Sequence, residues 1–218
     1  MSVILLVRHG QASFGEPDYD ALSELGVRQS QILGRALAAR GVEPDLLVTG
    51  RMKRHLQTLE HAAESARWDA PTEVDEGWNE FDHEQMIEVH EPAPRQAFEE
   101  MFEAATSRWA AGEHDHEYTE SFTAFGQRVQ EALRRTSSAL EPKQTAVVFT
   151  SGGPISRVAA SILSPSGACG TELWGQMNTT TINAAVTKVV VGARGHTVVS
   201  TNDHSHLEAA GLGLITYR

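Results

Sequence analysis

Cysteine, basic residues and long hydrophobic runs are all scarce in this chain. The single cysteine, Cys169, rules out an internal disulfide framework and any zinc or iron–sulfur site built from several cysteines. Lysine and arginine number 18 against 29 acidic residues, for a formal net charge of −11, which argues against nucleic acid or an anionic membrane as a partner. The apolar run 3–7 is too short for a signal peptide or a membrane span and leads directly into Arg8. We therefore expect a cytoplasmic protein with no nucleic-acid or membrane partner.

The distribution of apolar runs indicates an α/β fold. With 218 residues, of which 40% are hydrophobic, the chain fits a single domain, and no internal repeat or low-complexity linker divides it. Helical segments separate the first three strand-like runs, which predicts a three-layer α/β/α sandwich with a mostly parallel central sheet. The strand-like runs are 3–7, 45–49, 146–150, 185–191 and 197–201.

One segment departs from this pattern, and we interpret residues 84–125 as a helical cap insertion. Residues 84–120 hold ten acidic residues and two arginines, Arg95 and Arg108, a sum of −8 (two minus ten). A cap of that charge over a pocket disfavours polyanions and favours a small phosphorylated substrate. Its aromatic residues are expected to pack the helices of the cap, with one or two of them available to line the mouth of a pocket: Phe98, Phe102, Trp109, Tyr118 and Phe122.

The most informative stretch, Leu6-Val7-Arg8-His9-Gly10-Gln11, lies at the end of the first strand-like run. Arginine binds anions, histidine can act as a nucleophile, and glycine lets the backbone turn tightly beside a ligand. The combination favours phosphate chemistry, with Gln11 as an additional site candidate. The alternative is a structural histidine at a strand end.

A second motif, Thr49 to Thr58, passes from a strand into a helix whose first turns carry Arg51, Lys53 and Arg54. Cations at a helix N-terminus oppose the helix dipole unless an anion lies there. Their position is better explained by a ligand than by helix stability, although a solvated basic face is the alternative.

A third motif, Trp78-Asn79-Glu80-Phe81-Asp82, places carboxylates among aromatic residues. Burial beside Trp78 and Phe81 would raise the pKa of such a carboxyl group, as a general acid requires. The alternative is an ordinary surface acid.

The order and spacing of four motifs resemble the histidine phosphatase (phosphoglycerate mutase-like) superfamily. The resemblance implies that His9 forms a phosphohistidine, that Arg8 and Arg54 hold the phosphoryl oxygens, and that Glu80 protonates the leaving oxygen, with no metal or other cofactor. The motifs are Leu6-Val7-Arg8-His9-Gly10, Leu22-Ser23-Glu24-Leu25-Gly26, Lys53-Arg54 with Gln57-Thr58, and Trp78-Asn79-Glu80.

One position departs from the family pattern. The strand that ends at Thr150 usually leads to a second His-Gly, and here it leads to Ser151-Gly152-Gly153. Serine supplies a neutral hydrogen bond but no positive charge, and removing one such donor typically costs about 10²–10³ in rate. The backbone amides of Gly152 and Gly153 at the following helix start are one source of compensation. A histidine elsewhere is another, with His206 and His204 as candidates.

Two pairs of histidines, His204 with His206 and His114 with His116, have the spacing of ligands on an extended strand. Neither pair lies on a clear strand, so we assign no metal.

The leading hypothesis is a cofactor-independent phosphomonoesterase. A phosphoglycerate mutase-type phosphotransferase is a second hypothesis, for which the cap offers Arg95 and Arg108 as the only extra basic groups. A third, from a different class, is a catalytically weak or inactive module that binds a phospholigand or a protein. Retention of both His9 and Glu80 argues against that third hypothesis. The oligomeric state stays open.

Overall fold

A computed structural model describes residues 1–13, 18–89, 98–167 and 170–217 of the chain. Cys169 and Arg95, along with Pro92 and Pro94 in the cap sequence, lie outside the described residues. Among the described residues, no helix has the length and apolar character needed to cross a membrane.

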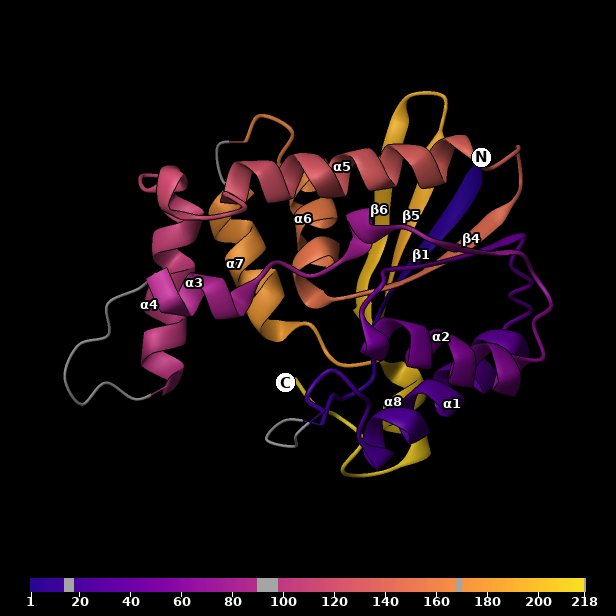
Figure 1. Ribbon diagram of the computed structural model, residues 1–218. Coiled ribbons are helices and arrows are strands. Elements are labelled where there is room, and N and C mark those ends of the chain that lie inside the picture. The colour runs from indigo at the N-terminus through magenta and orange to yellow at the C-terminus, as the bar shows by residue number, and fades with distance from the viewer. Residues whose placement is uncertain (14–17, 90–97, 168–169, 218) are drawn as a thin grey trace.

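A six-stranded sheet in the order β3-β2-β4-β1-β5-β6 forms the centre of the molecule (Figure 1). The first four strands of this order run parallel, and β5 and β6 continue the sheet antiparallel. The strands are β1 (Ser2–Arg8), β2 (Leu46–Thr49), β3 (Thr72–Val74), β4 (Thr145–Thr150), β5 (Val186–Gly192) and β6 (Gly195–Asp203).

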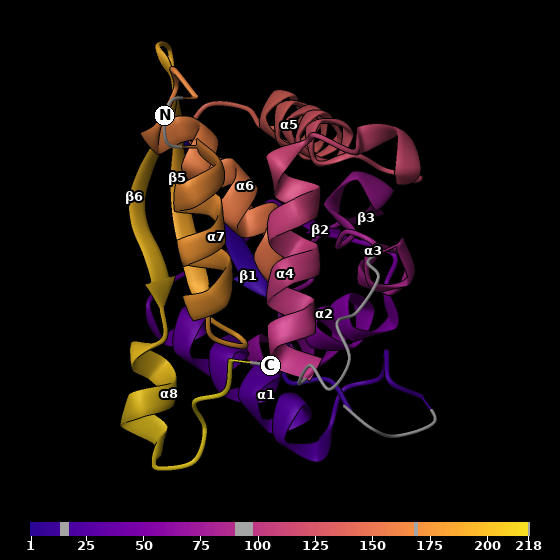
Figure 2. The same cartoon turned by 90° about the vertical axis from the view of Figure 1, so that its left-hand side faces the viewer.

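Helices cover both faces of the sheet, which confirms the predicted three-layer α/β/α fold. Side chains of α1, α2 and α8 pack in one hydrophobic cluster, and side chains of α4, α5, α6 and α7 pack in the other. Figure 2 shows α4 and α7 side by side, with α5 across the top. The helices are α1 (Glu24–Ala39), α2 (Lys53–Ala66), α3 (His83–Val89), α4 (Phe98–Ala111), α5 (Phe122–Ser138), α6 (Gly152–Leu163), α7 (Gly170–Thr180) and α8 (Ser205–Ala210), with short 3₁₀ helices at Glu76–Trp78 and Asp115–Glu117.

The continuous apolar sequence of β1 follows from this sandwich. Ile4 and Leu6 belong to the cluster under α5 and α6, whereas Leu5 and Val7 belong to the cluster under α1 and α2. Successive side chains of a strand point to opposite faces, so the central residues of a strand covered on both sides all face a hydrophobic cluster. The same alternation holds in β4.

The helix α1 begins directly after Ser23, within the motif at residues 22–26. The Ser23 side chain accepts a hydrogen bond from the Gly26 N–H at 3.1 Å and caps α1. Leu33 and Leu37 of this helix are buried against the sheet and belong to its hydrophobic core.

Candidate active site

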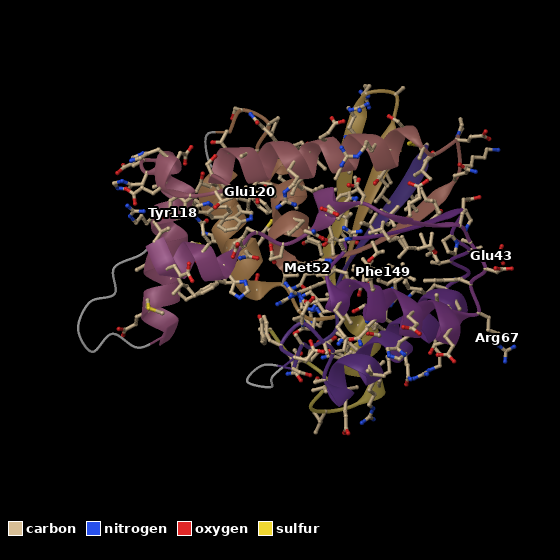
Figure 3. The ribbon with its side chains drawn as sticks, in the orientation of Figure 1. Glu43, Met52, Arg67, Tyr118, Glu120 and Phe149 are labelled. Carbon is tan, nitrogen blue, oxygen red and sulfur yellow. The ribbon has the colours of Figure 1, made fainter. Side chains whose placement is uncertain are left out.

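Three loops leave the sheet at one edge because their strands are parallel and in register. Arg8 of β1 lies opposite Thr150 of β4, and Thr49 of β2 lies opposite Phe149 of β4. Figure 3 labels Phe149 at this edge, together with Met52, which precedes α2. The carboxyl ends of parallel strands are where open α/β sheets bind their ligands. The first two motifs and the loop after β4 therefore meet here, and the third motif follows β3, whose Val74 lies opposite Thr49 of β2.

His9 lies immediately after β1 with only 7% of its surface exposed. Its Nδ1 is 2.7 Å from the carbonyl oxygen of Gly10. A carbonyl can only accept, so Nδ1 carries the proton and Nε2 keeps its lone pair. Burial, followed by the charges of Arg54 and Arg8, holds the pKa of His9 well below its usual value. His9 is therefore a neutral imidazole with a free nucleophilic nitrogen.

Two glycines allow the backbone of the His9 loop to touch the start of α1. A Cβ at Gly10 would lie 2.4 Å from the carbonyl oxygen of Gly26, and a Cβ at Gly26 would lie 2.1 Å from that of Gln11. Neither gap admits a side chain, since the opposing atoms belong to backbone. This close approach fixes where His9 stands relative to α1.

Buried amide side chains form hydrogen bonds to the backbone of the same loop. Gln29, fully buried in α1, accepts a hydrogen bond from the Gln11 N–H at 2.8 Å and donates to Thr216 Oγ1 at 2.8 Å. Thr216 in turn donates to Asn183 at 2.9 Å, and the Asn183 side chain donates to the His9 carbonyl at 3.1 Å. The side chain of Gln11 itself accepts a hydrogen bond from Ser23, at the start of α1, at 2.9 Å. The His9 backbone is thus held by a chain of hydrogen bonds.

Two guanidinium groups flank His9 and depress its pKa. Arg54, in the first turn of α2, has a side chain only 5% exposed and pairs with Asp20 at 2.6 Å. Arg8, the last residue of β1, donates from Nη1 to the carbonyl of Thr181 and, at 2.6 Å, to that of Tyr217. The structure thus brings together the two arginines that the sequence predicted to hold an anion.

The other cations of the α2 motif have different surroundings. Arg51 pairs with Glu76 at 2.8 Å and Lys53 pairs with Asp18, and both basic side chains are exposed. Carboxylates on the surface, not a buried anion, therefore balance these two charges. The alternative of a solvated basic face describes them, and Arg54 alone of the three turns inward.

Glu80 lies at the end of the third motif, against the loop that follows β4. Its Oε2 accepts a hydrogen bond from the Gly153 N–H at 3.1 Å, and its Oε1 accepts from the Phe81 N–H at 3.2 Å. Burial raises the pKa of Glu80, although the Gly153 N–H and the Arg54 charge partly oppose the shift. The predicted direction is confirmed. A Cβ at Gly153 would lie 2.1 Å from Glu80 Oε1, so only glycine admits this carboxyl group.

Ser151 is fully buried between β4 and α6, but its hydroxyl does not cap α6. Its Oγ lies 2.6 Å from Nε2 of His55, a fully buried residue of α2. Gly152 follows beside Arg8, since a Cβ there would lie 3.7 Å from Arg8 Nε. No motif in the sequence predicts a role for His55. The available indication was that His55 directly follows Arg54. Nothing in the local sequence, however, links His55 to Ser151, which lies 96 positions away.

His206, an additional candidate, is buried but directed elsewhere. Its Nε2 lies 3.0 Å from the carbonyl oxygen of Ala184, whose own N–H donates to the carbonyls of Arg8 and His9. Burial lowers the pKa of His206 to about 4. Its described contact is thus with the backbone next to β1, one step removed from the His9 side chain. Its neighbour His204 hydrogen-bonds to the carbonyl of Asn202 at 2.6 Å.

Within residues 84–125 the aromatic side chains of Trp109, Tyr118 and Phe122 are all buried, as expected for residues that pack helices together. The Trp109 ring lies 4.8 Å from that of Phe81, so α4 packs directly against the Glu80 motif. Arg108 donates to Tyr118 Oη and to Glu117, both at 2.7 Å. In Figure 3, Tyr118 lies at the left of the view, well apart from Met52 and Phe149.

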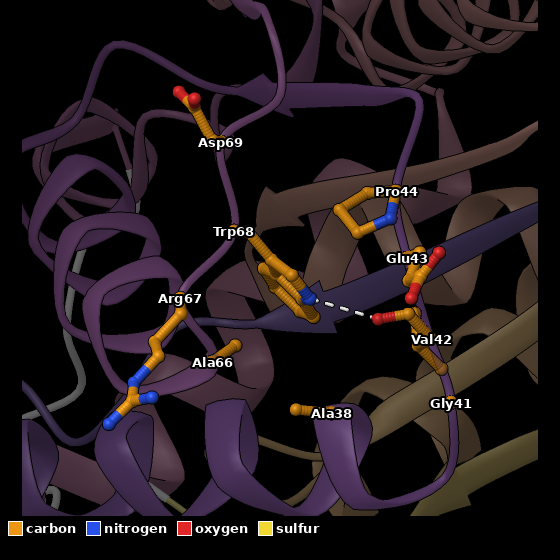
Figure 4. A pocket seen from close by; sticks show the side chains of 9 residues that line it. All are labelled: Ala38, Gly41, Val42, Glu43, Pro44, Ala66, Arg67, Trp68 and Asp69. Atoms are coloured by element: carbon orange, nitrogen blue, oxygen red, sulfur yellow. Dashed lines mark hydrogen bonds between the residues drawn. The ribbon is translucent and has the colours of Figure 1, made fainter.

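A separate hollow of about 350 Å³ lies at the opposite end of α2 (Figure 4). It lies between the ends of α1 and α2, where the Trp68 indole donates to the carbonyl of Val42 at 2.9 Å. A helix of 14 residues is about 21 Å long, so this hollow is remote from His9.

A neutral imidazole between two guanidinium groups, with a carboxyl group of raised pKa nearby, is chemically suited to phosphoryl transfer. The chain belongs to the histidine phosphatase superfamily (branch 1), whose family model matches residues 4–204. This confirms the resemblance found in the sequence.

Solved structures share the fold over nearly the whole chain. YhfR from Bacillus stearothermophilus is 21% identical, with a TM-score of 0.69, covering 94% of this chain and 99% of that one. Phosphoserine phosphatase from Entamoeba histolytica, solved with phosphoserine, is 18% identical, with a TM-score of 0.70 and coverage of 95% and 100%. Phosphoglycerate mutase from Bacillus anthracis is 16% identical, with a TM-score of 0.69 and 94% of each chain covered. No curated protein matches the chain.

Proposed function

We propose that the protein is a phosphomonoesterase that works through a phosphohistidine on His9. The observation that carries the proposal is the state of that imidazole: Nδ1 is held by the Gly10 carbonyl, and burial with two adjacent arginines keeps the ring neutral. Nε2 then attacks phosphorus while the bond to the ester oxygen breaks. Arg8 and Arg54 balance the charge on the phosphoryl oxygens.

Glu80 supplies the proton that the leaving alkoxide needs. Its raised pKa favours the protonated carboxyl group before the ester bond breaks. After that transfer the carboxylate accepts a proton from the attacking water, which displaces the phosphoryl group from His9. Inorganic phosphate leaves, and both groups return to their starting states.

The substrate in this proposal is a small phosphorylated metabolite admitted past a cap formed by residues 84–125. The net charge of −8 over 84–120, from two basic and ten acidic residues, disfavours polyanions. Asp18 and Asp20 add negative charge beside α2, where they pair with Lys53 and Arg54. Phosphoserine and 3-phosphoglyceric acid, bound in the structures of the Entamoeba phosphoserine phosphatase, are of the size we propose.

The mutase hypothesis has less support in the cap. It needs extra basic groups to retain a bisphosphate, and Arg108 is already engaged by Glu117 and Tyr118. Net release of phosphate from a monoester is what separates the two activities.

The test is phosphate release from p-nitrophenyl phosphate by the wild type and by His9→Ala, without added metal. Loss of the nucleophile should lower kcat on the order of 10⁴-fold or more. Acid-labile phosphate should become attached to the wild type during turnover and not to the variant. Equal release by both would exclude His9 as the nucleophile, and phosphate binding without release would favour a non-catalytic module.

A further inference from the structure

A second buried imidazole lies in the site and takes no part in the mechanism above. The rings of His55 and His9 are 5.7 Å apart between centroids and tilted by 37°. His55 has no exposed surface, and its Nε2 lies 2.6 Å from the Ser151 hydroxyl oxygen. The contact joins the first turn of α2 to the loop after β4, so it orients one part of the site against another.

The proton on His55 has a preferred position. Burial and the neighbouring Arg54 lower the pKa of His55 well below its usual value, so the ring is neutral and carries one proton. Nδ1 is buried and finds no hydrogen-bond partner among the described residues. The backbone of Gly50 packs closely against this nitrogen: a Cβ at Gly50 would lie only 2.4 Å from His55 Nδ1. A proton on Nδ1 would be a buried donor without an acceptor, whereas a proton on Nε2 is donated to Ser151.

The direction of that hydrogen bond decides what Ser151 can do. If Nε2–H donates to Oγ, the serine hydroxyl has used one lone pair and keeps its own proton for another acceptor. Ser151 follows β4 and His9 follows β1 at the same edge, where the His9 N–H donates to the carbonyl of Thr150 at 2.8 Å and the charges of Arg54 and Arg8 act on His9. An oxygen of that group is the acceptor available to a hydroxyl at this place.

We propose that His55 is a positioning residue that holds the Ser151 hydroxyl as a hydrogen-bond donor to the phosphoryl oxygens. The serine in the loop after β4 then supplies the hydroxyl donor, and the histidine in α2 fixes the direction of that hydroxyl, which would otherwise be free to rotate. This role rests on the proposed function, because it requires a phosphoryl group on or near His9. The donor matters most where negative charge on the oxygens is redistributed in the transition state.

The test is a double-variant cycle of His55→Ala and Ser151→Ala. Each single change should lower kcat by roughly 10²-fold with little change in KM, and the double variant should be no slower than either single one, because all three remove the same donor. His55→Gln should keep most of the activity, since a glutamine amide can donate from near the position of Nε2. If the two losses in kcat multiplied in the double variant, or if His55→Gln were as slow as His55→Ala, the proposed role of His55 would be wrong.

A second readout separates positioning from a merely structural effect. Orthovanadate adopts the five-coordinate geometry of phosphoryl transfer, so its affinity should fall much more than that of inorganic phosphate in His55→Ala and Ser151→Ala. His61→Gln, on the same helix, is the matched control and should change neither affinity, and thermal unfolding verifies that each variant is folded. If the wild type releases no phosphate, the proposed function fails. Independently of turnover, unchanged vanadate affinity in His55→Ala and Ser151→Ala would exclude the proposed role of these two residues.

Discussion

The loops that follow β1 and β4 leave the sheet side by side, but they hold their functional side chains in opposite ways. In the β1 loop the imidazole is oriented by a neighbour in sequence, because His9 Nδ1 bonds to the carbonyl of Gly10, while the loop backbone packs against α1 and is bonded by Asn183. The β4 loop depends on distant residues, since Ser151 contacts His55 of α2 and Gly153 donates to Glu80. The imidazole of the nucleophile is thus oriented by a local contact, while the side chains that assist it are oriented by contacts between distant segments.

The two loops also differ in the contacts that their backbones make. A chain of buried amides and a hydroxyl supports the His9 carbonyl, from Gln29 through Thr216 to Asn183. The β4 loop instead begins a helix, and its glycines lie close to side chains of the site. Substitutions in the first loop should therefore disturb folding, and substitutions in the second should disturb chemistry.

The largest effect should come from Gly10→Ala. The new Cβ would lie 2.4 Å from the Gly26 carbonyl oxygen, a backbone atom that cannot move without shifting α1. We expect a loss of about 3 kcal/mol in the free energy of unfolding, with activity lost alongside. Urea denaturation measures the first and phosphate release the second.

Gly152→Ala is the matched control in the β4 loop. Its Cβ would meet the Asn178 side chain at 3.0 Å, which can turn aside, and no backbone atom comes as close. The free energy of unfolding should change by less than about 1 kcal/mol. Equal destabilisation by the two alanines would break the comparison between the loops.

A smaller, selective effect is expected for Gly153→Ala. The Cβ would occupy the space of Glu80 Oε1, at 2.1 Å, so the carboxyl group must turn away while the backbone stays in place. We expect kcat for alkyl phosphates to fall by about 10²-fold, with a much smaller loss for p-nitrophenyl phosphate, because an activated leaving group needs no proton.

Glu80→Gln should show the same dependence on the leaving group as Gly153→Ala. If the two substrates lost activity equally in both variants, Glu80 would not be the proton donor. The double variant should be no slower than either single one, since both changes remove one acid.

The contrast between the loops also explains how much the sequence could predict. His9 and Arg8 follow a strand directly, so their place at the sheet edge was predictable from a contiguous motif, as was the three-layer fold from alternating strands and helices. The contact of Ser151 with His55 was not, because parallel pairing of β2 and β4 joins segments about a hundred residues apart. For the same reason, the sequence does not distinguish His55 from His204 and His206 as the histidine that compensates for Ser151.

Charge at a helix start was likewise a partial guide. Arg51, Lys53 and Arg54 look alike in sequence, but only Arg54 is buried near His9, while the other two pair with carboxylates at the surface. Which side of α2 faces the sheet depends on the packing of Thr58 and Ala62, both fully buried. That orientation follows from tertiary packing.

The smallest predicted effect is a displacement of the pH profile, whose acid limb is assigned to His9 and whose alkaline limb is assigned to Glu80. Turnover needs neutral His9 and protonated Glu80. The pKa of His9 is held well below its usual value by burial and by Arg54, so the acid limb of kcat/KM should lie well below the usual histidine range. Burial raises the pKa of Glu80, so activity should fall again as pH rises through that raised value. The optimum for alkyl phosphates should therefore lie between the lowered pKa of His9 and the raised pKa of Glu80. The alkaline limb should weaken for p-nitrophenyl phosphate and disappear in Glu80→Gln, whereas the acid limb should persist in both. Because ionisation of the phosphate affects both substrates, an alkaline limb that is identical for the two would assign it to the substrate and remove Glu80 from the profile.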